Sequence, residues 1–311
     1  MSSQSTRTYN LPTSGVWFIT GCSSGLGKQL AQTARAKGHR VAVTARKPED
    51  LDYFSDDDSN VLKLLVDVTS KSSIDDAVEL SLSRFGRLDV VVNNAGYSLR
   101  GDTENASEQA ARHLVDTMFW GTAHLTRHAM RIMREENPKN GPQGGVVLNV
   151  SSMGGRVAFA GNAFYHAAKF AIEGFTESVS KEVRPDWNIH FSLIEPGGVK
   201  TDYATRSMIN ISPHPAYAAP DTPARILEQY MNDPNALKNW ADADAVANAM
   251  YSIVASGNEI PLRIPLGPDA WGMLKVENER NGQQLEQYKE LSMGVGNAGQ
   301  FQAIGFLHNQ K

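Results

Sequence analysis

The stretch VWFITGCSSGLG, residues 16–27, decides which fold the rest of the chain must match. Its first five residues form a short apolar run, and glycines follow at positions 21, 25 and 27. After the glycines, apolar residues recur at spacings of three and four, which marks one face of a helix. The stretch therefore predicts a strand, a glycine-rich turn and a helix, the unit that opens dinucleotide-binding α/β domains.

The same alternation continues along the chain. Further short apolar runs predict strands at residues 40–45, 62–66, 89–93, 145–150, 189–194 and 262–265, with helices expected at 72–85, 107–136, 164–183 and 244–256. Strands that alternate with amphipathic stretches build a parallel sheet with helices on both faces. The predicted fold class is α/β, with a single Rossmann-type, doubly wound parallel sheet of about seven strands.

Changes in composition indicate the domain boundaries. We expect a flexible N-terminus over residues 1–13, one folded domain over 14–292 and a C-terminal tail over 293–311. Residues 201–239 combine five prolines with apolar side chains, which predicts an insertion that lines a substrate site. The alternative for that segment is an irregular surface loop.

Charge and cysteine content exclude several functional classes. The 311 residues carry 30 basic and 34 acidic side chains, a balance that argues against a nucleic-acid partner. The single cysteine, Cys22, forms no intramolecular disulfide and no cysteine zinc cage, which fits a reducing compartment. No apolar window approaches the roughly 20 residues that span a bilayer. We expect a cytoplasmic protein without membrane insertion.

Several short motifs follow the predicted strands and suit a nicotinamide dinucleotide. The glycines allow positive φ and let the backbone approach a pyrophosphate at a helix N-terminus. Arg46 stands after the second strand, where an NAD site offers an acidic residue, so NADP(H) is favoured over NAD(H). Asp67 and Val68 are placed to meet the adenine, and the small residues of NNAG, 93–96, let a ribose approach. Each motif also has a purely structural alternative. The glycines and NNAG can form tight turns, Arg46 can be a solvated loop arginine, and Asp67 can cap a helix or a turn.

Three side chains are candidates for chemistry. Tyr165 and Lys169 are four residues apart in a predicted helix and therefore share one face. An ammonium beside a phenol favours the phenolate, so the tyrosine can exchange a proton with a substrate oxygen. Ser152, in the turn after the fifth strand, can donate a hydrogen bond to the same oxygen.

Taken together, TGCSSGLG (20–27), NNAG (93–96), Ser152, YHAAK (165–169) and PGGVKTDY (196–203) resemble the classical short-chain dehydrogenase/reductase family. The resemblance is close over residues 14–202, and beyond them the chain is similar to longer members that resemble retinol and hydroxysteroid dehydrogenases. It implies an NAD(P)(H)-dependent oxidoreductase with Tyr165 as acid/base, Lys169 holding the nicotinamide ribose, and Ser152 orienting the carbonyl. It also implies a cofactor site formed by Gly21, Ser24, Gly25, Leu26, Gly27, Asn94, Ala95, Gly96, Pro196, Gly197, Val199 and Thr201.

One position departs from the family pattern. Met118 stands where many members carry an asparagine that bends its helix and supports a proton relay. A methionine keeps the relay if the bend survives; alternatively it only fills a gap in the core. The paired His124 and His128 lack further recognisable ligands, so no metal is predicted.

These observations lead to one main functional hypothesis and one rival. The main hypothesis is an NADP-dependent carbonyl reductase or alcohol dehydrogenase that acts on a small hydrophobic substrate. The rival is an NADP(H)-binding regulator or non-redox catalyst with the same fold. Apolar residues Phe170, Phe175 and Val179 on one helix favour a homodimer or homotetramer, unless they belong to the core.

Overall fold

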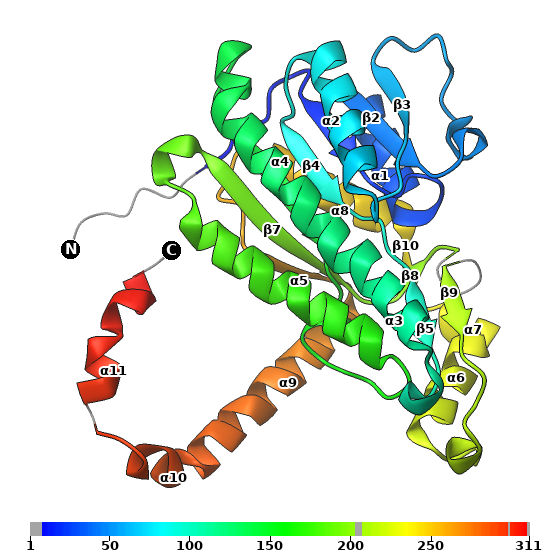
Figure 1. Ribbon diagram of the computed structural model, residues 1–311, viewed down its shortest axis with the longest axis vertical. Coiled ribbons are helices and arrows are strands. Elements are labelled where there is room, and N and C mark those ends of the chain that lie inside the picture. The colour runs from blue at the N-terminus through cyan, green and yellow to red at the C-terminus, as the bar shows by residue number, and fades with distance from the viewer. Residues whose placement is uncertain (1–7, 203–206, 298, 310–311) are drawn as a thin grey trace.

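A seven-stranded sheet forms the centre of the computed structural model, which describes residues 8–202, 207–297 and 299–309 (Figure 1). Its strands are β1 (Val16–Ile19), β2 (Arg40–Ala45), β3 (Val61–Leu65), β4 (Val90–Asn93), β6 (Gly145–Val150), β7 (Ile189–Pro196) and β11 (Arg263–Leu266). They lie in the order β11-β7-β6-β4-β1-β2-β3, and every pairing is parallel. The predicted doubly wound α/β sheet is confirmed, with strand ends shifted by one or two residues.

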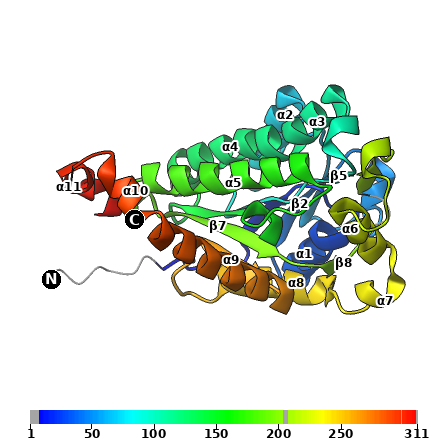
Figure 2. The same ribbon diagram turned by 90° about the horizontal axis from the view of Figure 1, so that it is seen from below.

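Helices cover both faces of this sheet. Figure 2 shows α2 (Lys71–Phe85), α4 (Gly121–Glu135) and α5 (Ala163–Glu182) on one side, and α1 (Gly25–Ala36), α8 (Ala243–Ala255) and α9 (Pro268–Gln287) on the other. Strand β1 supplies both cores: Trp17 and Ile19 pack in the cluster with α1 and α8, and Phe18 packs in the cluster with α2 and α4. Because both faces are buried, the strands read as continuous apolar runs.

The long helix expected at residues 107–136 is interrupted in the structure. It begins as α3 (Glu108–Val115), capped by Ser107, whose hydroxyl accepts a hydrogen bond from the Ala110 N–H. A π-helix, Asp116–Trp120, follows, and α4 then completes the run. Propensity and periodicity cannot distinguish this widened turn from an ordinary helix, so the sequence predicted one element.

Strand order places a cleft at one edge of the sheet. β1 lies between β2 and β4, so the connections that leave β1 and β4 diverge to opposite faces. Ligands of open α/β sheets bind at this point, beyond the carboxyl ends of the strands. The loops after β1, β4, β6 and β7 meet there.

The segment predicted as an insertion contains ordered elements. β9 (Met208–Asn210) pairs in parallel with β5 (Ser98–Arg100), and β10 (Ala241–Asp242) pairs with β8 (Val199–Lys200). Helices α6 (Pro223–Asn232) and α7 (Pro234–Leu237) lie between them. The segment is therefore attached to the sheet domain through two short ladders; its residues 203–206 lie outside the described residues.

At the start of the chain, packing extends beyond the expected boundary. Tyr9 is only 4% exposed and packs in the core beside α1 and α8, so packing begins before residue 14. After α9 come α10 (Lys289–Gly294) and α11 (Gly299–Ala303), whose described side chains are exposed. No helix within the described ranges combines the length and apolarity that crossing a membrane requires.

The residues behind the oligomer prediction separate into two groups. Val179 is buried in the core, and Phe175 packs partly buried against the same cluster. Phe170 is 45% exposed. Two of the three apolar side chains therefore serve the domain's own core, the alternative that the sequence left open.

Candidate active site

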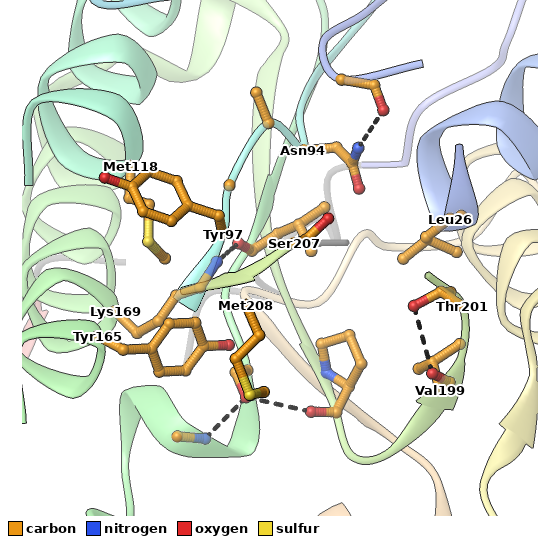
Figure 3. Close-up of a pocket in the computed structure, with 18 of the residues that line it drawn as sticks. Leu26, Asn94, Tyr97, Met118, Tyr165, Lys169, Val199, Thr201, Ser207 and Met208 are labelled. Atoms are coloured by element: carbon orange, nitrogen blue, oxygen red, sulfur yellow. Dashed lines mark hydrogen bonds between the residues drawn. The ribbon is translucent and has the colours of Figure 1, made fainter. Parts of the chain in front are cut away.

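A cavity of about 570 Å³ opens at the carboxyl ends of the strands (Figure 3). One group of lining residues, here named the nucleotide half, comes from the loops after β1, β2, β3 and β4: Gly21, Ser24, Gly25, Leu26, Arg46, Asp67, Val68, Asn94, Ala95 and Gly96. A second group, the substrate half, comprises Phe159, Met208, Ile209, Leu227, Tyr230, Met231 and Trp240. Ser152, Tyr165, Lys169, Pro196, Gly197, Val199 and Thr201 line the cavity as well.

The glycine loop packs closely against the loop that follows β4. Gly21 and Gly25 have φ values of 70° and 56°, which side chains rarely adopt. The Asn94 amide donates hydrogen bonds to the carbonyls of Thr20 and Gly21, at 2.9 and 3.1 Å. Asn94 therefore holds the loop in place from inside the cavity.

Gly27 is the one predicted cofactor residue that does not line the cavity. A Cβ at this position would lie 2.3 Å from the Gly21 carbonyl oxygen and 2.5 Å from Asn94 Nδ2. Gly27 thus lets α1 pack against the loop. The helix begins after Ser24, which makes no side-chain cap hydrogen bond, so the N-terminus of α1 is suited to an anion.

The far end of the nucleotide half contains charged groups. Arg46 is exposed. Asp67 Oδ1 accepts hydrogen bonds from the backbone and hydroxyl of Thr69. Partial burial opposes its ionisation, but these hydrogen bonds and the nearby His113 and Arg46 lower the pKa of Asp67. The alternative turn role of Asp67 is therefore present alongside its place in the cavity wall.

Tyr165 and Lys169 extend from α5 into the cavity on the same side, as Figure 3 shows. Lys169 Nζ lies 5.7 Å from the Tyr165 ring centre and donates a 2.6 Å hydrogen bond to the Val150 carbonyl. Burial lowers the pKa of Lys169 to about 8, against the raising effect of Glu173. The lysine therefore still carries a charge at neutral pH, beside the phenol whose ionisation that charge favours.

Ser152 occupies the turn between β6 and the short helix Met153–Gly155. Its Oγ accepts a hydrogen bond from the Gly154 N–H at 3.0 Å and lies 3.4 Å from the Pro196 carbonyl oxygen. This contact orients the hydroxyl between α5 and the end of β7. The structure thus brings Ser152, Tyr165 and Lys169 to one wall.

His166, which the sequence did not single out, supports this wall. Its Nδ1 contacts the Gly154 carbonyl at 2.8 Å, and its Nε2 accepts a hydrogen bond from the Phe159 N–H at 3.0 Å. The second contact requires a neutral imidazole with its proton on Nδ1, and burial lowers the pKa of His166 accordingly. Its only signal in the sequence was its position next to Tyr165.

Met118 lies at the centre of the π-helix and is 1% exposed. The helix is therefore locally widened at this position although the asparagine is absent. The methionine also packs in a core cluster with Leu114 and Ile172. The packing interpretation therefore agrees with the structure, and Met118 also lines the cavity; its part in a proton relay stays a prediction.

The sequence predicted the substrate half only as a segment, residues 201–239, and did not identify its individual lining side chains. Its side chains are apolar or aromatic, and Trp240 Nε1 donates a hydrogen bond to Tyr230 Oη at 3.0 Å. A buried ion pair attaches α6 to the sheet domain: Arg225 Nη2 lies 3.2 Å from Asp102 Oδ1. Asp102 Oδ2 accepts a further hydrogen bond from the His214 N–H. Such distant partners leave no local pattern in the sequence.

The histidines considered as metal ligands, and the single cysteine, have structural contacts instead. His128 Nε2 lies 2.7 Å from Asp75 on α2, a carboxylate that the sequence did not connect with it. Among the described residues, no group of three or more histidines, cysteines or acids is arranged to hold a metal. Cys22 is fully buried, and burial raises its pKa to about 12, which suits the predicted packing role.

Comparisons with known proteins agree with this geometry. The family model described as short chain dehydrogenase matches residues 15–210. The protein named oxidoreductase calM, from Penicillium decumbens, is 42% identical over 94% of this chain and 96% of its own. A short-chain dehydrogenase structure from Streptomyces avermitilis, 30% identical, superposes with a TM-score of 0.81 over 92% of this chain and all of that one. A Burkholderia phymatum structure in complex with NAD, 20% identical, shares the fold at a TM-score of 0.73 and covers 87% of this chain and 95% of that one.

Proposed function

The chain belongs to the short-chain dehydrogenase family of oxidoreductases, and from this premise we propose that it is an NADP(H)-dependent enzyme. It interconverts a carbonyl and an alcohol on a hydrophobic small molecule. The observation that carries the proposal is the position of Ser152, Tyr165 and Lys169, which line the same cavity as both the nucleotide half and the apolar substrate half.

The residues of the nucleotide half fit a dinucleotide phosphate. The uncapped N-terminus of α1 and the positive-φ glycines form a cradle that any Cβ would obstruct: at Gly21 it would lie 2.9 Å from Ala95 Cα. Arg46 supplies an exposed guanidinium suited to a 2′-phosphate. When bound, the nicotinamide supplies or accepts the hydride.

The chain's own residues supply the proton and orient the substrate carbonyl group. In the reductive direction, Tyr165 donates its phenolic proton to the carbonyl oxygen of the substrate, and the Lys169 ammonium stabilises the phenolate that remains. Ser152 Oγ holds the same oxygen by a hydrogen bond. In the reverse direction the phenolate removes the alcohol proton.

The substrate half limits what these residues can act on. Its seven side chains are uncharged. Burying a charged substrate group against them would leave that group without a partner. A neutral, largely apolar ketone, aldehyde or alcohol therefore fits best.

Transfer of a deuterium label tests the reaction. The protein is incubated with cell extract and NADPH deuterated at C4, and small molecules are searched by mass spectrometry for incorporated deuterium. We expect a labelled product with the wild-type protein and a loss of about a thousandfold with Tyr165→Phe. Tyr251→Phe, which removes a phenolic hydroxyl on α8 that does not line the cavity, is the matched control and should retain labelling. Equal labelling by wild type and Tyr165→Phe would refute the mechanism.

A further inference from the structure

A buried acidic cluster lies directly behind the catalytic wall. Glu173 follows Lys169 by one helical turn on α5 and is 5% exposed. Glu195 immediately precedes Pro196 at the end of β7 and is fully buried. Neither carboxyl group has a role in the proposed reaction.

Most oxygens of this cluster lack a hydrogen-bond donor. Arg263 Nε donates to Glu173 Oε2 at 2.9 Å. Among the described residues, Glu173 Oε1, both carboxyl oxygens of Glu195 and the Ser151 hydroxyl have no hydrogen-bond partner and are inaccessible to solvent. Gly155 brings two of these groups close together, because Ser151 Oγ and Glu173 Oε1 lie 2.4 and 3.3 Å from the point where its Cβ would stand.

Two neighbouring cations lie within ion-pair distance of Glu195 and lower its pKa in part, but neither donates a hydrogen bond to it. Its nearest guanidinium nitrogens are Arg156 Nη1 at 3.7 Å and Arg263 Nε at 3.9 Å, beyond hydrogen-bond range. Both arginines donate elsewhere: Arg156 to Asn278 Oδ1 at 3.0 Å, and Arg263 Nη2 to Glu177 Oε2 at 2.7 Å. An ionised carboxylate at Glu195 would thus be buried beside a second carboxylate without a donor.

A single proton shared between Glu173 and Glu195 would remove the repulsion between the two buried carboxylates and supply the missing donor. A protonated carboxyl group has an O–H donor, so an opposing pair of acceptors becomes a donor and an acceptor. Arg263 Nε donates to Glu173 Oε2, whereas the guanidinium groups stay beyond hydrogen-bond range of Glu195, so the geometry points to Glu195 as the partner that holds the proton. Burial, together with the neighbouring Glu173, raises the pKa of Glu195 to about 7.

We propose that Glu195 is a positioning residue that carries a proton and donates it in a hydrogen bond to Glu173, joining the end of β7 to the helix that bears Tyr165 and Lys169. The bond links Pro196, at the cavity wall, to α5 through the protein interior. It also keeps the acid pair at a single negative charge beside the Lys169 ammonium. Ionisation of Glu195 breaks the bond and adds a second charge there.

Protonation of Glu195 makes the free energy of unfolding depend on pH in a definite direction. A carboxyl group whose pKa is higher in the folded than in the unfolded state binds a proton on folding between the two values. Stability due to Glu195 is therefore present at pH 5 and is lost as the pH rises through about 7. The charged groups that face it are Arg156, Glu173 and Arg263, with Lys169 and Glu177 beyond them on α5.

Glu195→Gln tests the proton directly, because an amide N–H₂ donates to Glu173 and does not titrate. Urea unfolding midpoints of the full chain are compared with wild type at pH 5 to 9. We expect similar midpoints at pH 5 and a higher midpoint for the variant at pH 8. A midpoint lowered at every pH above 5 would overturn the proposal, since it would mean that an ionised Glu195 is held by the arginines.

Glu177→Gln is the matched control. Glu177 accepts from Lys181 and Arg263, which lower its pKa to about 2, so it acts as an ionised partner in the same network. Its replacement should lower the midpoint at neutral pH. Opposite effects of two glutamate-to-glutamine changes would separate a protonated acid from an ionised one.

Two kinetic readouts rest on the proposed function. We expect the ratio of kcat/KM for Glu195→Gln over wild type to rise between pH 6 and pH 8, because only the wild type gains the second charge. Gly155→Ala, which inserts a methyl group 2.4 Å from Ser151 Oγ and 3.1 Å from Glu173 Cγ, should lower kcat while leaving NADPH affinity unchanged. A ratio of kcat/KM, Glu195→Gln over wild type, that does not change with pH would refute the link to catalysis. The unfolding series needs no substrate, so it tests the buried proton even if the redox proposal fails.

Discussion

The nucleotide half and the substrate half of the cavity are built by different means. The nucleotide half lies on strand ends of the central sheet, and its closest contacts involve backbone: Asn94 holds Thr20 and Gly21 by their carbonyls. The substrate half comes largely from residues 207–240, which reach the domain through two short ladders and the Asp102–Arg225 pair. The first arrangement resists change because backbone positions are shared with the sheet. The second depends on a few separate attachments outside the central sheet.

Removing the attachment of the substrate half should have the largest effect. Arg225→Met leaves the Asp102 carboxylate, 3% exposed, with a hydrogen bond from the His214 N–H but without its guanidinium partner. Breaking a buried pair in this way costs about 3 kcal/mol. We expect a lower free energy of urea unfolding and a higher substrate KM, with unchanged NADPH affinity by fluorescence titration.

A double variant provides the control for this prediction. Asp102→Asn combined with Arg225→Met removes the stranded charge and should recover part of the lost stability. If NADPH affinity falls together with substrate affinity in Arg225→Met, the two halves are coupled and the comparison fails.

Changing the charge in the nucleotide half should have the next largest effect. Arg46→Asp replaces a donor to the 2′-phosphate with a repelling carboxylate, so NADPH affinity should fall by about tenfold to a hundredfold. NADH, which lacks that phosphate, should be affected much less. The neighbouring exposed Lys47→Asp is the control for general surface charge. An unchanged ratio of the two affinities, measured by calorimetry, would refute the assignment.

The smallest effect is expected at Met118, in the cavity wall. Because the π-helix is present with a methionine at its centre, Met118→Asn should change kcat by less than about threefold. Met118→Leu, which keeps the side chain apolar, controls for packing. A larger gain for the asparagine variant alone would show that the side-chain amide, and not only the bend, takes part in the proton relay.

The sequence predicted the features that depend on residues close together in the chain. The β1 turn and the strand periodicity depend on neighbours within a few residues, so the seven strands were found within one or two residues of their ends. The Tyr165–Lys169 pair was equally accessible because i, i+4 spacing places both on one face of α5. His166 was adjacent to them, but its partners Gly154 and Phe159 were not evident.

The π-helix and the substrate half were beyond such reasoning. A widened turn has the composition of an ordinary helix, so residues 116–120 read as part of one long element. Residues 201–239 were identified as a lining segment by proline and apolar content alone. Which of their side chains face the cavity depends on β9 pairing with β5, about a hundred residues earlier.

The sequence by itself determined the parallel sheet, the glycine turn and the residues available for chemistry, because each is set by local periodicity or by a backbone requirement of glycine. Only the tertiary structure decided that Gly27 is a packing residue, that Tyr9 belongs to the core, and that Glu173 and Glu195 meet behind Lys169. Those outcomes depend on which strands are neighbours and on how much water their packing excludes. Burial turns a common acidic residue into one that holds a proton, and no local pattern in the chain records burial.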